Sequence, residues 1–83
     1  MKVASAKEKL NRAVAAVAAV LVDFRKSAGM SQEQLAFDCE LHPTYISKLE
    51  RGLKTPTLYT LFLIADALKK TPQEFVRKID SLR

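Results

Sequence analysis

One cysteine and one histidine lie close together in this sequence, and both side-chain types can do chemistry. Cys39 and His42 are three positions apart, so they could hold a metal ion or pair a thiol nucleophile with a base. Two ligands do not complete a zinc site, and no carboxylate is placed to orient the histidine. Cys39 also falls on the expected buried face of a helix, where cysteine behaves as a small hydrophobic residue. We therefore expect a structural cysteine and no metal.

Other catalytic signatures are missing from the sequence. It contains no nucleophile–base pair, no glycine-rich phosphate loop and no paired-carboxylate motif, so we expect neither enzymatic activity nor a cofactor. A single cysteine excludes a disulfide within the chain and fits a reducing compartment, which favours the cytoplasm.

A group of outward-facing polar side chains offers a different chemistry, the binding of a polyanion. Ile46 and Leu49 must face the core from a short helix, and this rotation turns Thr44, Ser47 and Lys48 outward. The chain carries fourteen Lys and Arg against nine Asp and Glu, which gives a net charge of +5. Such an excess suits a polyanionic partner, although charge does not determine the fold.

Helix signals along the chain favour an all-α fold. The 83 residues include only two glycines and three prolines, few for a β fold with many turns. A long first helix is expected over residues 6–28, from a Ser5–Glu8 capping box to Gly29. Its apolar residues recur at spacings of three and four, and those expected to face inward are Leu10, Val14, Val17, Leu21, Phe24 and Ala28.

Four shorter helices are expected to follow. Ser31 caps the second, Pro43 lies in the first turn of the third, and Thr57 caps the fourth. A capping box at Thr71–Glu74 opens the fifth. The residues expected to face inward are Leu35, Ala36, Cys39, Ile46, Leu49, Leu58, Leu61, Ile64, Ala65, Leu68, Phe75 and Ile79. With no repeat and no linker, we expect one compact five-helix domain over residues 1–83.

An uninterrupted apolar run, residues 13–22, follows a basic start and is similar to the apolar region of a signal peptide. The run is much shorter than the roughly 20 residues that a membrane-spanning helix needs. Leu21, Phe24 and Arg25 belong to a pattern that the rest of the chain needs. We therefore expect the run to be part of the first helix, and we expect no membrane partner.

Several short motifs follow one another in a fixed order across the middle of the chain. They are Phe24-Arg25, Gly29-Met30-Ser31-Gln32, Leu35-Ala36, Tyr45-Ile46-Ser47-Lys48-Leu49-Glu50-Arg51-Gly52, Pro56-Thr57-Leu58 and Ile64-Ala65-Asp66-Ala67-Leu68. Each is weak alone, but the ordered set resembles the Cro and phage-repressor (Xre-like) family over about residues 20–70. The resemblance implies a lambda-repressor-like fold, with a helix-turn-helix at about residues 31–52, that binds double-stranded DNA.

The resemblance implies two kinds of DNA contact. The third helix would place Thr44, Lys48 and Pro43 near base edges, where lysine can donate to guanine and proline offers only apolar contact. The residues implied to contact the sugar–phosphate backbone are Gln32, His42, Tyr45, Ser47, Arg51 and Lys54. The alternative for Tyr45 is packing of its ring in the core, and the alternative for Gln32 is a solvated residue in the first helical turn.

Two further features depend on the resemblance. Arg25 and Glu50 are similar to a pair that ties the first helix to the end of the third, and the alternative is an ordinary exposed pair. A buried pair costs desolvation, so its value would lie in orienting the third helix rather than in stability. Glu40 stands where this family often has glycine, and a left-handed backbone there would carry strain of about 1 kcal/mol.

Apolar residues that the core does not use predict a homodimer. They are Tyr59, Phe62 and Leu63 on the fourth helix and Val76 and Leu82 on the fifth. An exposed apolar patch marks an association surface, and a C2 dimer on two half-sites about 34 Å apart would supply specificity that one helix-turn-helix lacks. The alternatives are that these residues cover a fraying carboxyl end, or that the amino half of the first helix makes the contact.

The expected function is that of a cytoplasmic transcriptional regulator. It would bind a palindromic or pseudo-palindromic operator as a homodimer, controlled by its own concentration, with no small-molecule ligand. Small members of the family include restriction–modification controllers, phage switches and antitoxins, and the run at residues 44–47 is most similar to the controllers. The competing hypothesis is a protein-interaction module, such as an antitoxin, that binds a partner protein through the apolar surface. Strong, salt-sensitive DNA binding would distinguish the two.

Overall fold

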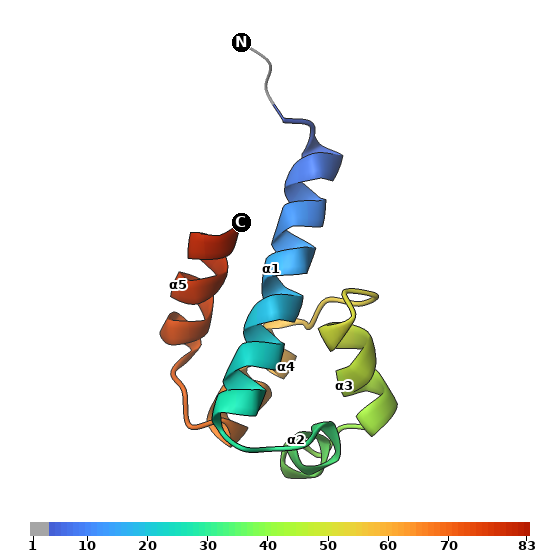
Figure 1. Ribbon diagram of the computed structural model, residues 1–83, viewed down its shortest axis with the longest axis vertical. Coiled ribbons are helices and arrows are strands. Elements are labelled where there is room, and N and C mark those ends of the chain that lie inside the picture. Colours follow the sequence, from blue (N-terminus) through green and yellow to red (C-terminus); the bar gives the residue numbers. More distant parts are fainter. Residues whose placement is uncertain (1–3) are drawn as a thin grey trace.

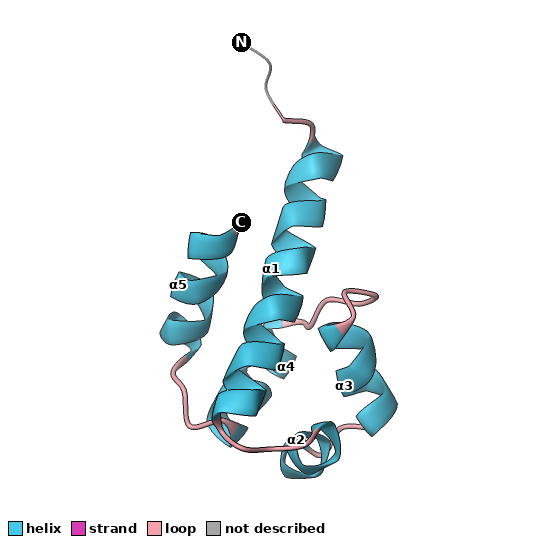
Figure 2. Ribbon diagram, viewed as in Figure 1, coloured by secondary structure: helices cyan, strands magenta, loops and turns pink. Residues whose placement is uncertain are grey.

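The computed structural model describes residues 4–83, and these residues form five α-helices and no strand (Figures 1 and 2). The helices are α1 (Ala6–Ser27), α2 (Gln32–Cys39), α3 (Pro43–Glu50), α4 (Leu58–Ala67) and α5 (Pro72–Leu82). The expected all-α, five-helix fold is confirmed. Residues 1–3 of the expected domain lie outside the described residues.

Side-chain caps fix where two of the short helices begin. At α5 the predicted capping box is formed: Thr71 Oγ1 accepts from the Glu74 N–H at 3.1 Å, and Glu74 Oε1 accepts from the Thr71 N–H at 3.2 Å. The hydrogen bond from the Thr71 backbone lowers the pKa of Glu74. At α2 the same reciprocal pair joins Ser31 and Gln34, at 3.0 and 2.8 Å. Each cap satisfies backbone N–H groups that the first turn of a helix leaves unpaired.

The first helix extends beyond the rest of the fold. It has 22 residues, roughly 33 Å at 1.5 Å per residue, and its first turns project beyond the end of α5 (Figure 1). The Ser5 hydroxyl accepts from the Glu8 N–H at 3.1 Å, which is the serine half of the predicted capping box. This projection stretches the molecule to 46 × 23 × 21 Å.

Three residues that were expected to face inward are exposed. Leu10 is 60% exposed because it lies on the part of α1 that has no helix beside it. Ala28 is exposed because it is the residue at which α1 ends. Leu58 is 64% exposed because it is the first residue of α4 and points away from the core. At Leu10 the apolar periodicity continues past the point where the neighbouring helices end.

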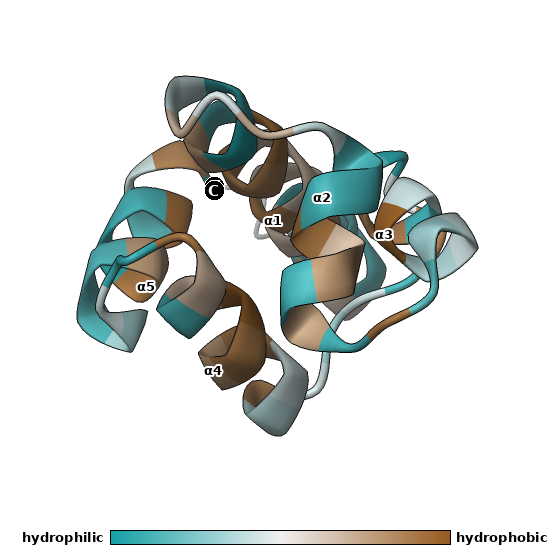
Figure 3. Cartoon of the chain, turned by 90° about the horizontal axis from the view of Figure 1, so that it is seen from below, coloured by the Kyte–Doolittle hydropathy of each residue, from teal (hydrophilic) through white to brown (hydrophobic). Residues whose placement is uncertain are grey.

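The core lies where the second half of α1 meets the other four helices, which surround a common interior in Figure 3. Its largest fully buried side chains are Val20, Leu21, Leu35, Ile46, Leu49, Ile64 and Phe75. The Phe75 ring packs edge-on against Phe24, with ring centroids 4.8 Å apart, and so joins α5 to α1. Lys70 Nζ lies 4.8 Å from the centroid of the Phe24 ring and covers this contact.

The apolar run at residues 13–22 belongs to the middle of α1, as expected. Within it, Ala16, Ala18, Val20 and Leu21 are buried against the other helices. Over residues 4–83, no helix combines the length and the apolar character that crossing a bilayer requires.

Residues with left-handed backbones make the sharp turns. Gly29 and Gly52 have φ of 71° and 72° and follow α1 and α3, as the sequence predicted. Glu40 has φ of 56° and follows α2, so the strain expected for a non-glycine residue at this position is present. Lys69 has the same φ between α4 and α5, and no sequence motif predicts a left-handed residue there.

Replacing Glu40 with glycine should stabilise the protein. Glycine adopts a positive φ without a steric penalty, so Glu40→Gly should raise the free energy of unfolding by about 1 kcal/mol in urea titrations. Glu33→Gly is the matched control, since it lies inside α2 and should lower that free energy by about 1 kcal/mol. Equal losses for both variants would contradict the strain at Glu40.

Candidate nucleic-acid interface

The helices α2 and α3 are joined by a tight turn at Glu40, Leu41 and His42. The turn is closed by two backbone hydrogen bonds to α2, from Glu40 N–H to the Phe37 carbonyl at 3.2 Å and from Leu41 N–H to the Ala36 carbonyl at 2.9 Å. Short helices packed across such a turn have the geometry of a helix-turn-helix.

The back of α3 is anchored in the core. Ile46 and Leu49 are 1% and 0% exposed, so the rotation of the helix that the sequence predicted is confirmed. Consequently Pro43 and Thr44 are exposed, and Ser47 and Lys48 are half-buried. The front of α3 therefore stays open to a partner.

His42 caps α3 and leaves one ring nitrogen for another contact. Its Nδ1 accepts a hydrogen bond from the Thr44 N–H at 3.0 Å. A neutral imidazole that accepts at Nδ1 carries its proton on Nε2, and the His42 side chain is exposed. The cap therefore holds the ring at the start of α3 with a donor directed away from the backbone.

The structure gathers five of the implied contact residues around one shallow hollow on this side. It is lined by His42, Thr44, Tyr45, Lys48 and Lys54. Tyr45 is half-buried, because its ring packs against the core as the alternative interpretation expected. Arg51 is exposed but lines a different hollow, beside Val14 and Ala18 of α1.

An ion pair fixes the orientation of α3 relative to α1. Arg25 Nε donates to Glu50 Oε2 at 2.6 Å, and a second guanidinium nitrogen donates to Glu50 Oε1 at 2.9 Å. The side chains are only 11% and 4% exposed, so this is not an ordinary surface pair. The hydrogen bond to Glu50 raises the pKa of Arg25, which therefore stays charged.

The same carboxylate also holds α2. Gln32 Nε2 donates to Glu50 Oε1 at 3.0 Å, and the third nitrogen of the Arg25 guanidinium donates to the Met30 carbonyl at 2.8 Å. One glutamate thus ties the end of α1, the start of α2 and the end of α3 together. The hydrogen bond from Gln32 to Glu50 could not be predicted from the sequence, because the spacing of the two residues is unrelated to any local motif.

Comparison with known proteins places this arrangement in a family. Residues 21–75 match the family described as "Helix-turn-helix", close to the 20–70 span expected from the motifs. The chain belongs to this helix-turn-helix family. The expected Xre-like resemblance is confirmed.

Relatives of this helix-turn-helix chain have been named for gene control. Control protein C.BamHI of Bacillus amyloliquefaciens is 45% identical over 49 residues, which cover 59% of this chain and 60% of that protein. Controller protein C.Esp1396I has been solved as a tetramer in complex with its natural 35 base-pair operator. One chain of it superposes on this chain with a TM-score of 0.77 at 32% identity, and the match covers 83% of this chain and 91% of that one. The regulator ClgR of Corynebacterium glutamicum gives 0.78 at 28% identity, with 83% and 90% covered.

Cys39 and His42, three positions apart in the sequence, have separate roles in this helix-turn-helix fold. Cys39 is buried, and burial, followed by the charge of Asp38, raises the pKa of its thiol to about 11. Cys39 is therefore a neutral thiol packed against α4 at neutral pH, whereas His42 is exposed at the cap of α3. Within the described part of the chain, no group of three His, Cys, Asp or Glu side chains is arranged to hold a metal ion.

Removing the charge of Glu50 should cost much of the stability of the domain. Glu50→Gln keeps the side-chain shape but leaves the buried Arg25 guanidinium without its anion, so the free energy of unfolding should fall by about 3 kcal/mol in urea titrations. Asp80→Asn breaks the exposed pair with Arg83 and serves as the control. It should leave the unfolding midpoint unchanged. A Glu50→Gln protein as stable as this control would show that the pair does not hold the helices.

Proposed function

We propose that this protein is a transcriptional regulator that binds specific sequences in double-stranded DNA. The observation that carries the proposal is the orientation of α3. The back of this short helix is buried, and its front presents Thr44 and Lys48. An isolated helix of this width fits the major groove of B-DNA. The helix-turn-helix relatives named as control proteins, one of them solved on its operator, support the same function.

In this proposal the residues at the front of α3 read the bases. Lys48 donates hydrogen bonds to guanine O6 or N7, and the Thr44 methyl group contacts a thymine methyl. Pro43 adds apolar contact only, because its side chain has no hydrogen-bonding group.

The surrounding residues bind phosphates and set the register on the duplex. His42 donates from Nε2, Lys54 lies in the same hollow, and Tyr45 reaches the backbone with its hydroxyl while its ring stays packed. Ser47 and Arg51 complete the set of backbone contacts.

Gln32 contributes from the start of α2. One of its amide hydrogens is donated to Glu50, which leaves the second for a phosphate oxygen beside the positive end of the α2 dipole. The bond to Glu50 thus aims a phosphate-binding group before DNA arrives.

The DNA-bound form is a homodimer built on α4 and α5. Tyr59, Phe62, Val76 and Leu82 are 70%, 42%, 52% and 52% exposed, and Leu63 is partly buried beside them. In Figure 3, α4 is apolar along most of its length, so it offers apolar surface outside the core as well as inside it. A shallow hollow lined by Leu58, Phe62 and Val76 gives a second copy a place to pack.

Regulation then follows from protein concentration, since dimerisation and DNA binding are coupled. Such a regulator works in the cytoplasm, alongside the DNA it controls.

The same apolar surface of α4 and α5 supports the competing function, a module such as an antitoxin that covers this surface with a different protein. Selection of bound duplexes from a random pool tests the choice, because a DNA-binding homodimer returns a palindromic motif and an interaction module returns none.

Replacing Lys48 and replacing Gln32 should weaken DNA binding in different ways. Lys48→Ala should weaken binding to the selected operator by about 1–3 kcal/mol and relax the preference at one base pair. Gln32→Ala should weaken specific and random duplexes alike, since it contacts the backbone. Binding titrations on both duplexes measure the difference. Equal losses for Lys48→Ala on the two duplexes would contradict its assignment as a base reader.

Phe62 should be required for dimerisation. Phe62→Ser places a hydroxyl in the apolar surface and should raise the dimer dissociation constant about tenfold or more in sedimentation equilibrium. Leu53→Ser is the matched control, because Leu53 is 62% exposed and lies outside α4 and α5. A wild-type protein that sediments as a monomer at tens of micromolar would rule out the dimer.

A further inference from the structure

The two ends of the molecule carry opposite charges. The segment 32–40 contains Glu33, Asp38 and Glu40 and no basic residue, although the whole chain has a net charge of +5. The first turns of α1 contain Lys7, Lys9 and Arg12 against a single acidic residue. These segments lie at opposite ends of the longest axis, with the start of α1 at the top of Figure 1 and α2 at the bottom.

Each charged end also exposes one large apolar side chain. Phe37 on α2 is 84% exposed, more than any other large apolar side chain in residues 4–83. Leu10 on α1 is 60% exposed. Neither belongs to the α4–α5 surface or to the front of α3, so the proposed function leaves both without a partner.

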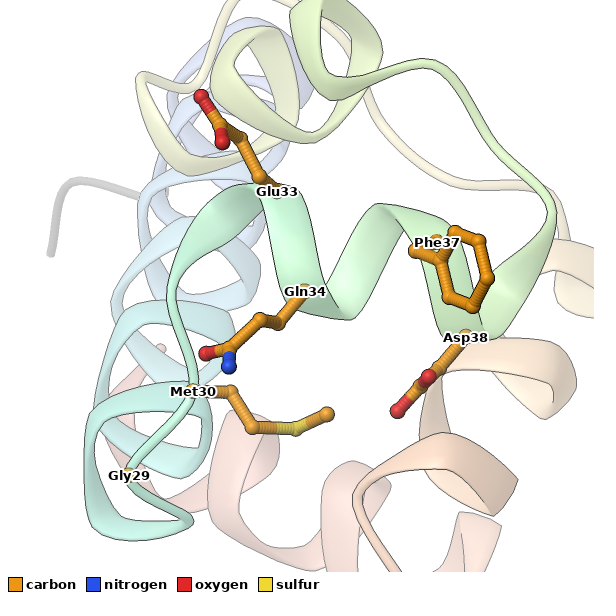
Figure 4. A pocket seen from close by; sticks show the side chains of 6 residues that line it. All are labelled: Gly29, Met30, Glu33, Gln34, Phe37 and Asp38. Carbon is orange, nitrogen blue, oxygen red and sulfur yellow. The ribbon is translucent and has the colours of Figure 1, made fainter.

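The charges flank the apolar side chains in a matching pattern. At 3.6 residues per turn, Lys7 and Lys9 fall on either side of Leu10 around α1. Around α2, Glu33 and Asp38 fall on either side of Phe37 in the same way. Figure 4 shows Phe37 beside Asp38 at the end of α2, next to a hollow that these residues line together with Met30 and Gln34.

We propose that the α1 end of one copy docks on the α2 end of another, head to tail. Leu10 packs against Phe37, while Lys7 and Lys9 lie against Glu33 and Asp38. One molecule cannot make this contact with itself, because its two ends are separated along the 46 Å axis. The chain therefore carries both halves of a heterologous interface.

The head-to-tail contact differs from the α4–α5 dimer in symmetry and in consequence. A heterologous contact leaves one free half on each of the two molecules that it joins, so it can link successive dimers into a row or a ring. It uses neither the hollow around Lys48 nor the apolar surface around Phe62. A small contact of this kind is weak between free molecules and is strengthened where neighbouring sites on one DNA hold dimers close together.

Sedimentation without DNA tests the contact independently of the proposed function. At millimolar protein and low salt, the weight-average mass of the wild type should rise with concentration above the mass of the α4–α5 dimer, or of the monomer if that dimer does not form. Adding 0.5 M salt should reverse the rise. Phe37→Ser and Leu10→Ser should each abolish it, with the apparent dissociation constant raised about tenfold or more. Leu53→Ser, a change at an equally exposed leucine, should leave it intact.

Mixing the two variants provides the decisive comparison. The Phe37→Ser protein keeps an intact α1 end, and the Leu10→Ser protein keeps an intact α2 end, so an equimolar mixture should associate although neither variant does alone. Loss with Phe37→Ser but not with Leu10→Ser would overturn the proposal and assign the α2 end to a symmetric contact or to another, basic protein. A wild-type mass that stays constant with concentration would also overturn it.

Discussion

A single carboxylate determines how the helix-turn-helix of this protein is oriented on the first helix. Glu50 accepts three hydrogen bonds, two from Arg25 at the end of α1 and one from Gln32 at the start of α2, while it belongs to the end of α3. These hydrogen bonds hold the orientation of α3, and that orientation sets where its outward side chains point. A buried pair of this kind adds little net stability relative to apolar packing, so its contribution is to hold one relative orientation of three helices.

The helices themselves could be predicted because their signals are local. Caps at Ser31, Thr57 and Thr71 and the turn glycines lie within a few residues of the ends they mark, and the buried faces follow from periodicity. The error at Leu10 has a structural cause. Periodicity shows which face of a helix is apolar, but it does not show how far the neighbouring helices extend alongside that face.

The candidate site was predictable to a similar extent. The burial of Ile46 and Leu49 fixes the rotation of α3, so the outward position of Thr44 and Lys48 could be read from the sequence. The bond between Gln32 and Glu50 could not, because it joins residues 18 positions apart on different helices. Arg51 illustrates the same limit, since only the packing of α1 against the end of α3 directs it away from the hollow around Lys48.

The helix α4 carries apolar residues both on its inner face and on its exposed face. Its inner face, with Leu61, Ile64 and Ala65, belongs to the core, while Tyr59 and Phe62 lie exposed on the same ten-residue helix. In the proposed homodimer, a second copy that covers the outer face would also hold the inner face in place, so the thermal midpoint would rise with protein concentration. At low abundance the unpaired chain would then unfold more often and be cleared faster by proteases, which would sharpen the threshold below which the protein is lost.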